Sequence, residues 1–298
     1  DCDSEQAKVR EINSGIYWFK AEKLSGLLDK LGNNNAAGEY YLTDTVAVAE
    51  KKGVYTADST DVVLGANSRS QLAALNEVAR KRKLAELMDE GVDIPLSDGI
   101  IIGKDVKIGH DTVILPNTII KGKTVIGNGC EIGPNSYIAD CVIEDNVILN
   151  NVQAHESKVD SCAKAGPFVH LRPNTHLHSG VKIGDFVEVK NSEIGINTCI
   201  AHLTYIGDSD VGKGVNFGCG CVTANYDGIK KYRTTIGDNA FIGCNTNLIA
   251  PVTIGDNATT AAGSTITKNV PADSLAVERG QTRIIEHWEK NSKRIKKA

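Results

Sequence analysis

An aliphatic residue recurs at every sixth position through much of the chain, and this repeat limits the fold more than any other feature. A glycine directly follows four of the seven isoleucines in the first series, which are Ile102, Ile108, Ile114, Ile120, Ile126, Ile132 and Ile138. Further series run from Leu171 to Phe217, where two intervals shorten to five residues, and from Ile236 to Ile266. A period of six matches neither a helix nor a simple alternating strand.

We expect each hexapeptide to form one short strand and one corner, with the aliphatic side chain pointing inward. Three hexapeptides then close a triangular coil of eighteen residues, and coils stack about 4.8 Å apart as parallel strands. Residues 100–270 would form about nine coils of a parallel β-helix. The composition agrees, because 29 glycines and only 5% aromatic residues suit tight corners around a core of small aliphatic side chains.

The chain before residue 93 lacks this repeat. An extended run at 15–19 and two amphipathic segments predict an α/β portion over residues 1–69. Helical spacing of leucines predicts a linker helix over residues 70–92, which Gly91 ends. The β-helix and its tail then occupy residues 93–298.

Charge and apolar patterning narrow the class of partner. A formal charge of -4 leaves no basic field for a phosphate backbone, so we expect no nucleic acid. No apolar stretch approaches the roughly 18 residues of a membrane helix, and the opening DCDSEQ is unlike a signal peptide, so we predict a cytoplasmic protein with no membrane partner.

The first residue is Asp rather than Met, which indicates a processed, truncated or engineered start. The eight cysteines form no C-x-x-C zinc pairs and are interpreted as buried, reduced thiols.

Coil arithmetic brings basic side chains together. Leu171 and Val189 are eighteen residues apart, so Arg172 and Lys190 should lie on one face of adjacent coils. Like charges opposed across strands are destabilising unless an anion lies between them, and phosphate is the usual anion. The alternative is that both side chains turn into solvent.

The same face continues in the next coil. With one five-residue interval counted, Tyr205 stacks on Glu188, and His202 lies near a corner of that face. A histidine beside a carboxylate and a cationic pocket suits general base catalysis. The repeat breaks again between Val222 and Ile236, which predicts an inserted loop that carries binding groups or is a plain surface excursion.

Long motifs then make a family resemblance specific. GPFVHLRPNT (166–175), AHLTYIGDSDVGKGVNFG (201–218) and TANYDGIKKYRTTIGDNAFIG (223–243) resemble the bacterial bifunctional family that is both glucosamine-1-phosphate N-acetyltransferase and N-acetylglucosamine-1-phosphate uridylyltransferase. NNNAAGEYYLTD (33–44) and GANSRSQL (65–72) resemble the end of its uridylyltransferase domain. The family belongs to the hexapeptide acyltransferases, so the resemblance, and not the spacing, implies a left-handed parallel β-helix.

The resemblance also implies an activity. The chain would transfer acetyl from acetyl-CoA to glucosamine-1-phosphate, giving N-acetylglucosamine-1-phosphate, a step towards UDP-N-acetylglucosamine for cell-wall and lipopolysaccharide synthesis. His202 would be the general base and Glu188 would help orient it. The positions that match sugar-phosphate contacts are Arg172, Lys190, Tyr205, Asn216 and Lys231. The positions that match contacts to the acetyl group or acetyl-CoA are Cys219, Asn225, Tyr226, Cys244, Ala262 and Arg279. The family assembles as a homotrimer with each site shared between subunits.

Three cysteines depart from the family pattern. Cys219, Cys221 and Cys244 stand where the family usually has Ala, Thr and Ser. A thiol is a weaker hydrogen-bond partner than a hydroxyl, so we expect backbone amides to orient the thioester. A covalent acetyl-cysteine is the less favoured alternative, because buried cysteines are usually inert.

The uridylyltransferase half departs further. Its glycine-rich nucleotide loop, and the Asp that pairs with an Asn to hold Mg²⁺, are absent from this sequence. Asn13 and Asn67 match sugar-nucleotide and magnesium positions, but a single neutral ligand cannot hold Mg²⁺. We therefore expect acetyl transfer without uridylyl transfer, with Mg²⁺ needed only by a complete uridylyltransferase domain.

Other classes of function remain as alternatives. One is another hexapeptide acyltransferase, and one is a non-catalytic scaffold built on a trimeric prism. A third is a zinc-dependent β-helix hydratase using His170, His176 and His178. Their spacing of six and two does not place these histidines on adjacent coils, which disfavours that reading.

Overall fold

The computed structural model describes residues 8–288, and the chain divides into two compact units, residues 1–79 and 80–298. The boundary falls inside the long helix α3 (Arg69–Asp89). This helix confirms the linker helix predicted from leucine spacing.

The first unit consists of short helices joined by irregular segments. Its elements are α1 (Ala21–Leu28), η2 (Leu42–Asp44), α2 (Thr45–Val48), η3 (Thr60–Val63) and the beginning of α3. Thr45 is the one fully buried residue among residues 8–79. The run at 15–19 is not a strand, because no neighbouring strand is present among the described residues of this unit to pair with it.

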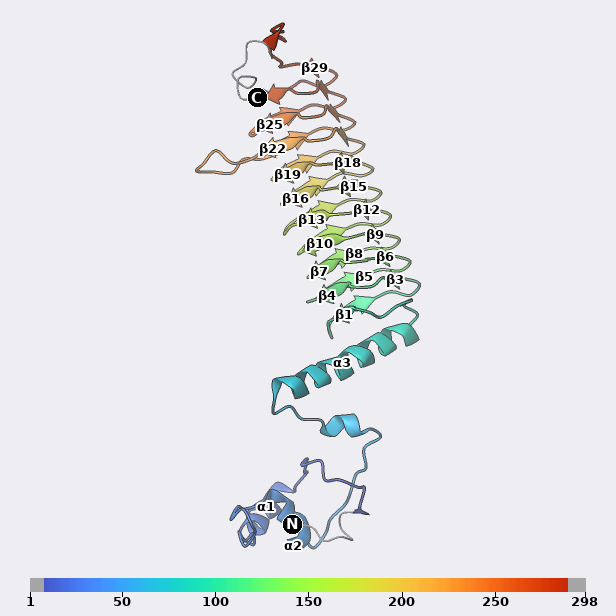
Figure 1. Ribbon diagram of the computed structural model, residues 1–298, viewed down its shortest axis with the longest axis vertical. Coiled ribbons are helices and arrows are strands. Elements are labelled where there is room, and N and C mark those ends of the chain that lie inside the picture. Colours follow the sequence, from blue (N-terminus) through green and yellow to red (C-terminus); the bar gives the residue numbers. More distant parts are fainter. Residues whose placement is uncertain (1–7, 289–298) are drawn as a thin grey trace, which may run out of the picture. The chain divides into compact units, whose positions relative to one another are not determined.

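The second unit is a stack of coils with three parallel sheets as its faces (Figure 1). The first face contains β1 (Ile101–Ile102), β4 (Ile119–Lys121), β7 (Tyr137–Ala139), β10 (Val152–His155), β13 (Val169–Leu171), β16 (Glu188–Lys190), β19 (Tyr205–Gly207), β22 (Val222–Ala224), β25 (Asn247–Ile249) and β28 (Thr265–Ile266). The second face contains β2 (Lys107–Ile108), β5 (Val125–Ile126), β8 (Val142–Ile143), β11 (Lys158–Val159), β14 (His176–Leu177), β17 (Glu193–Ile194), β20 (Ser209–Val211), β23 (Thr234–Ile236) and β26 (Val252–Ile254). The third face contains β3 (Val113–Ile114), β6 (Glu131–Ile132), β9 (Ile148–Leu149), β12 (Lys164–Ala165), β15 (Lys182–Asp185), β18 (Cys199–His202), β21 (Asn216–Phe217), β24 (Phe241–Ile242), β27 (Thr259–Thr260) and β29 (Leu275–Ala276).

The repeated aliphatic side chains form the core of this stack. All seven isoleucines of the first series are at most 8% exposed. The predicted parallel β-helix is therefore confirmed, while its left-handedness stays a prediction. Two faces hold ten strands and the third holds nine, close to the predicted nine coils. Some coils are shorter than eighteen residues, since Tyr137 pairs with Gln153 and Glu188 pairs with Tyr205.

The second half of α3 covers the first coil. Leu84 and Leu87 are buried there, and the Arg80 guanidinium donates to the carbonyl oxygens of the first coil. Gly91 follows the helix with a φ of 94°, and the Val92 N–H bonds back to the Leu87 carbonyl oxygen at 2.9 Å. This is a Schellman-type stop, which only glycine adopts without strain, as the position of Gly91 predicted.

One corner of the coils repeats a left-handed backbone residue. Asparagine and glycine suit this conformation, and they occupy the corner at Asn117, Asn135, Asn151, Gly220, Asn245 and Gly263. In the three middle coils the corner residues are Phe168, Phe186 and Leu203 instead, each more than half exposed. The two phenylalanine rings stack with centroids 5.1 Å apart. We call these three residues the apolar corner.

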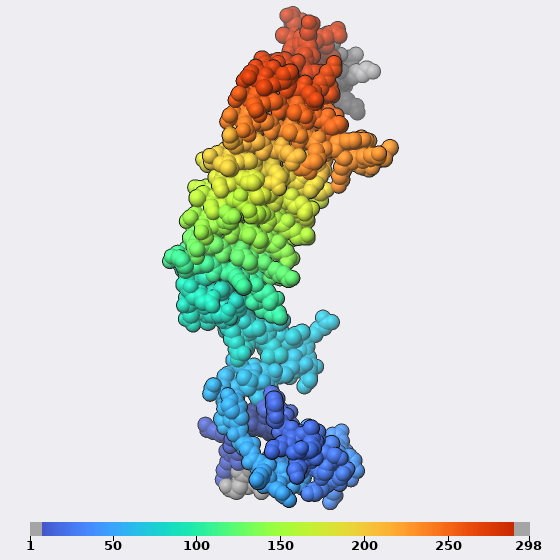
Figure 2. All heavy atoms as spheres, turned by 180° about the vertical axis from the view of Figure 1, so that it is seen from behind, coloured from blue at the N-terminus to red at the C-terminus, as the bar shows by residue number. Residues whose placement is uncertain are grey.

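A loop projects from the stack between β22 and β23, at residues 225–233 (Figures 1 and 2). It folds as a hairpin, in which Tyr226 and Lys231 form an antiparallel bridge and the Tyr232 N–H donates to the Asn225 carbonyl oxygen at 2.8 Å. The inserted loop predicted from the break in the repeat is therefore confirmed.

The cysteines of the described chain are free thiols, with varied burial. Burial raises the pKa of Cys141 and of Cys221 to about 11, which keeps both protonated. The prediction of uniformly buried thiols is wrong for Cys162 and Cys244, which are exposed at corners of the coils, and for Cys199 and Cys219, which are only partly buried. Cys2 lies outside the described residues. Among residues 8–288, no helix is both long and apolar enough to cross a membrane.

Candidate active site

Charged side chains gather where successive strands of the first face end. Leu171 pairs with Val189, so Arg172 and Lys190 follow at equivalent positions of adjacent coils, as predicted. The Arg172 NH1 atom lies 2.7 Å from Oε1 of Glu188. This hydrogen bond raises the pKa of the Arg172 guanidinium, which remains charged.

A second cation reaches Lys190 from the projecting loop. A hydrogen bond from Lys231, partial burial and repulsion between the two ammonium groups together lower the pKa of Lys190. Asp208 is 6% exposed beside them. Burial by itself raises the pKa of Asp208, but hydrogen bonds from Asn191 and Asn225 and the charges of both lysines outweigh it, so the pKa is lowered.

Asp208 was missed by sequence reasoning, although the seventeen-residue coil places it level with Asn191, next to Lys190, and the coil count could have found it. It joins Glu188 as one of two carboxylates facing three cations: Arg172, Lys190 and Lys231. Three positive charges against two negative ones leave one positive charge in excess. We call these five side chains the cationic cluster. Its composition suits a monoanionic or dianionic ligand such as a sugar phosphate.

His202 lies at the corner that leads into the cationic cluster. It ends β18 on the third face, is exposed, and pairs with Asp185 of the previous coil. Tyr205, three residues later, pairs with Glu188 on the first face, which confirms the predicted stacking. Among residues 8–288, no hydrogen bond or ion pair joins Glu188 to the His202 ring, since the carboxylate engages Arg172.

The residues matched to acetyl-CoA contacts continue in line from His202. The carbonyl oxygens of His202, Cys219 and Cys244 each accept a hydrogen bond from a left-handed corner residue of the next coil, at 2.7–3.3 Å. Ala262 precedes the corresponding glycine one coil further on. A Cβ built on that glycine would lie 4.0 Å from Cδ of Arg279. These five residues therefore form one column along a corner of the solenoid, which we call the corner column.

Three other predicted residues are placed differently. Asn216 lies exposed on the third face in β21, not among the cations of the first face. Asn225 is buried and donates to Asp208, which connects the loop to the cationic cluster. The Tyr226 hydroxyl donates to the Gly228 carbonyl oxygen at 2.6 Å within its own loop.

The two residues matched to the uridylyltransferase lie in the first unit. Asn13 donates to the Tyr17 hydroxyl, and the Asn67 backbone N–H donates to Gln71. Both side chains are neutral amides. These residues do not fit Mg²⁺, which requires carboxylate or phosphate oxygens.

The three histidines considered for zinc do not share a site. His170 lies on the first face, next to the ring of His155, and burial lowers its pKa. His176 and His178 lie on the second face with ring centroids 4.0 Å apart. Sequence reasoning missed that these two approach Asp160, because it compared the histidines only with one another.

Comparison with known proteins agrees with this architecture. The family described as "Bacterial transferase hexapeptide (six repeats)" matches residues 233–268. The bifunctional protein GlmU of Clostridium acetobutylicum is 48% identical over 97% of this chain and 64% of its own length. GlmU of Acetivibrio thermocellus is 50% identical over 97% of this chain and 63% of its own length.

A solved structure of UDP-N-acetylglucosamine acyltransferase from Francisella novicida is far more distant. It is 16% identical over 60% of this chain and 64% of that chain, with a TM-score of 0.39. The curated relatives are much closer, and this chain spans a little under two thirds of their length. By its sequence, the chain belongs to the same family as these bifunctional GlmU proteins.

Proposed function

We propose that this chain transfers the acetyl group of acetyl-CoA to the amine of glucosamine-1-phosphate. The proposal rests on the order of groups along one coil: His202 belongs to the corner column, and the first-face strand that follows it, Tyr205–Gly207, leads to Asp208 of the cationic cluster. The cluster offers an excess positive charge to a phosphate, and the column offers a continuous surface to an extended cofactor. A histidine between the two is placed to act on an amine and a thioester brought together there.

The proposed mechanism is direct transfer without a covalent enzyme intermediate. His202 takes a proton from the amine as its nitrogen attacks the thioester carbonyl carbon. Backbone N–H groups of the corner stabilise the tetrahedral oxyanion. The C–S bond then breaks, and CoA leaves as a thiolate that takes up the proton. In this mechanism Arg172, Lys190 and Lys231 hold the phosphate, while Tyr205 and Asn216 contact the sugar phosphate from the flanking coils.

Acetyl-CoA would lie along the corner column. Cys219, Cys244, Ala262 and Arg279 line it, and Asn225 and Tyr226 approach the acetyl group from the loop in this proposal. Cys221 is not available as a nucleophile at neutral pH, because burial raises its pKa to about 11. This removes Cys221 as a covalent acetyl carrier.

We further propose that the enzyme is a homotrimer with each site completed by a second copy. The apolar corner supports this, because Phe168, Phe186 and Leu203 are exposed in the coils that carry the site. Each bulky residue with left-handed φ costs about 1–2 kcal/mol. Contact with another copy of the chain would bury these side chains and offset that strain.

The same proposal assigns a role to each part of the chain. We assign residues 1–69 to the end of a uridylyltransferase domain, 70–92 to a linker and 93–298 to the acetyltransferase. We expect no uridylyl transfer from this chain, since a neutral asparagine such as Asn67 cannot hold Mg²⁺ by itself. The free thiols support a reducing compartment, and therefore the cytoplasm.

A thiol-release assay tests the proposal. Purified chain is mixed with acetyl-CoA and glucosamine-1-phosphate, and free CoA is followed. Release should require both substrates and should fall sharply when glucosamine replaces its phosphate. Release with other amino sugars but not with glucosamine-1-phosphate would instead support another hexapeptide acyltransferase, and no release with any acceptor would support a scaffold. Formation of UDP-N-acetylglucosamine from UTP and N-acetylglucosamine-1-phosphate would contradict the expected lack of uridylyl transfer.

A further inference from the structure

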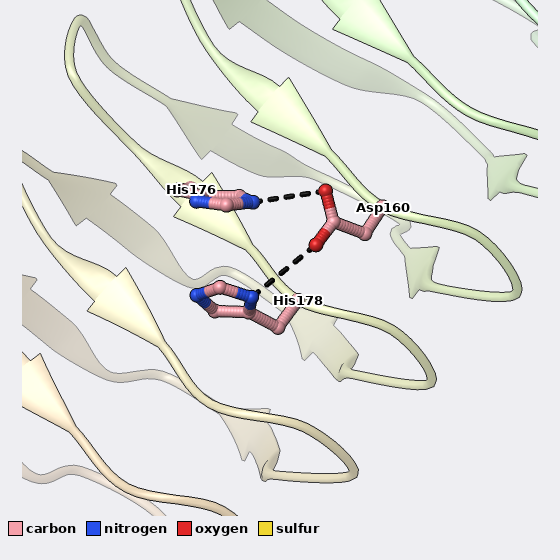
Figure 3. A group of neighbouring side chains, drawn as sticks. All are labelled: Asp160, His176 and His178. Atoms are coloured by element: carbon pink, nitrogen blue, oxygen red, sulfur yellow. Dashed lines mark hydrogen bonds and ion pairs between the residues drawn. The ribbon is translucent and has the colours of Figure 1, made fainter.

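Two histidines and a carboxylate meet on the second face, away from the candidate active site (Figure 3). His176 and His178 flank Leu177, so their side chains leave the strand on the same side. Asp160 lies one coil earlier, eighteen residues before His178. His176 Nε2 is 2.9 Å from Asp160 Oδ1, and His178 Nδ1 is 3.2 Å from Asp160 Oδ2.

A second carboxylate stands behind both rings. Oε2 of Glu193, in the next coil, lies 3.0 Å from Nδ1 of His176 and 3.0 Å from Nε2 of His178. Each imidazole therefore has one nitrogen facing Asp160 and the other facing Glu193. A carboxylate that holds the outer nitrogen is how proteins fix the tautomer and orientation of metal-binding histidines.

We propose that Asp160, His176 and His178 bind one divalent transition-metal ion of the zinc class, with Glu193 as the outer carboxylate. One oxygen and two nitrogens lie within 4.8 Å of one another. Ligands bound to a single zinc ion at about 2.0–2.2 Å lie roughly 3.3–3.6 Å apart in a tetrahedron. Small side-chain rotations are enough to reach that geometry, and imidazole with carboxylate favours Zn²⁺, Co²⁺ or Ni²⁺ over Mg²⁺ or Ca²⁺.

The charge of this site and its access to solvent both suit a metal ion. The Asp160 side chain is only 12% exposed, and its carboxylate also meets Lys158 Nζ at 2.9 Å. A surface depression of about 490 Å³ is lined in part by Lys158, His176 and Glu193, so this side of the cluster is open to solvent.

The four residues come from three successive coils, so the bound ion would tie those coils together.

Calorimetric titration with Zn²⁺ tests the site in the full chain, after the exposed thiols have been capped with iodoacetamide. We expect one equivalent per chain, and at least 10–100-fold weaker binding in His176→Gln and His178→Gln. His110→Gln is the matched control, because His110 is an exposed histidine that pairs with Asp111 elsewhere on the stack. Equal zinc binding in all four proteins, or no binding at all, overturns the proposal.

Two further measurements separate a metal site from a merely structural cluster. Glu193→Gln should weaken Zn²⁺ binding by about 10–100-fold while keeping one equivalent, as expected for an outer partner. Zn²⁺ should raise the unfolding temperature of the unsubstituted chain but not of the near-isosteric Asp160→Asn variant, and EDTA should reverse the rise. Circular dichroism checks that each variant is folded. If Zn²⁺ raised the unfolding temperature of Asp160→Asn as much as that of the unsubstituted chain, the assignment would be refuted.

Discussion

Glu188 and Arg172 form an ion pair between adjacent coils, with 2.7 Å between Oε1 and NH1. Both side chains are more than one third exposed, so the pair itself contributes only about 0–1 kcal/mol to stability. Its importance is geometric, because it holds the guanidinium at the edge of the cationic cluster. Glu188 therefore acts first on Arg172, whereas the family resemblance assigned it to His202.

Replacement of Glu188 separates these two roles. In Glu188→Gln we expect a higher KM for glucosamine-1-phosphate with kcat changed by only a few-fold, because Arg172 loses its charged partner. Steady-state CoA release measures both constants. A large fall in kcat with unchanged KM would restore the role of Glu188 in orienting His202.

Replacement of His202 tests the proposed general base. His202→Ala should lower kcat by about 10² or more with a modest change in KM, because a general base acts on the transition state. The exposed His110 provides the control, and His110→Ala should be unaffected. A loss confined to KM would mean that His202 binds substrate and does not move a proton.

Replacement of Lys190 tests the phosphate site. Lys190→Ala should mainly raise the KM for glucosamine-1-phosphate, because it removes one of three cations. Lys107→Ala changes an exposed lysine on the second face and should leave KM unchanged. If both variants gave the same KM as the parent chain, the cationic cluster would not be the phosphate site.

The lowered pKa of Lys190 also predicts a pH dependence. A lysine with a lowered pKa loses its charge at a lower pH than an ordinary lysine. The KM for glucosamine-1-phosphate should therefore begin to rise on the alkaline side earlier than free lysine would allow. Lys231→Ala removes the hydrogen bond and the repulsion that lower this pKa, so it should move the onset to higher pH even though KM itself is larger. An onset that moved to lower pH would contradict this electrostatic account.

A glycine in the strand beside His202 is required by close packing. A Cβ on Gly184 would lie 2.0 Å from the Ala201 carbonyl oxygen, so Gly184→Ala must displace the end of β18. We expect a lower unfolding temperature and a fall in kcat, because His202 is the next residue. In Gly103→Ala the nearest atom lies 3.6 Å away, and this control should keep both near the parent values.

The apolar corner predicts a link between assembly and strain. If the chain forms the proposed trimer, Phe168→Asn with Phe186→Asn should shift it from trimer to monomer in sedimentation velocity at low concentration, because the apolar contact is lost. The same double variant should relieve left-handed strain, so the separated chain should unfold no more easily than the parent. Trimers that persisted unchanged would place the subunit interface elsewhere.

Coil arithmetic predicted positions well because stacked strands keep a nearly constant spacing. It placed Arg172 beside Lys190 and Tyr205 opposite Glu188, and the aliphatic repeat predicted the core. It did not predict which partner each side chain chooses, because several partners lie within reach of one strand position. The Glu188 carboxylate turned to Arg172 because the guanidinium offers a full charge in the adjacent coil.

The residues that sequence analysis missed were all missed for the same reason. Asp208 and Asp160 are single acidic residues with no sequence motif, and only the count across coils brings them to Lys190 and His178. Compared along the chain, the histidines at 170, 176 and 178 looked unrelated to any carboxylate. Counted by coils, two of them fall next to Asp160 and Glu193.

The coil that carries the projecting loop contains more residues than the other coils of the stack. Asp210 pairs with Thr235, a separation of 25 residues, yet the strands beyond it keep their parallel register. The solenoid thus tolerates extra length at a corner without passing any displacement on to later coils. A change in the length of this hairpin would therefore leave the later strands, and the side chains that they carry, in their present positions.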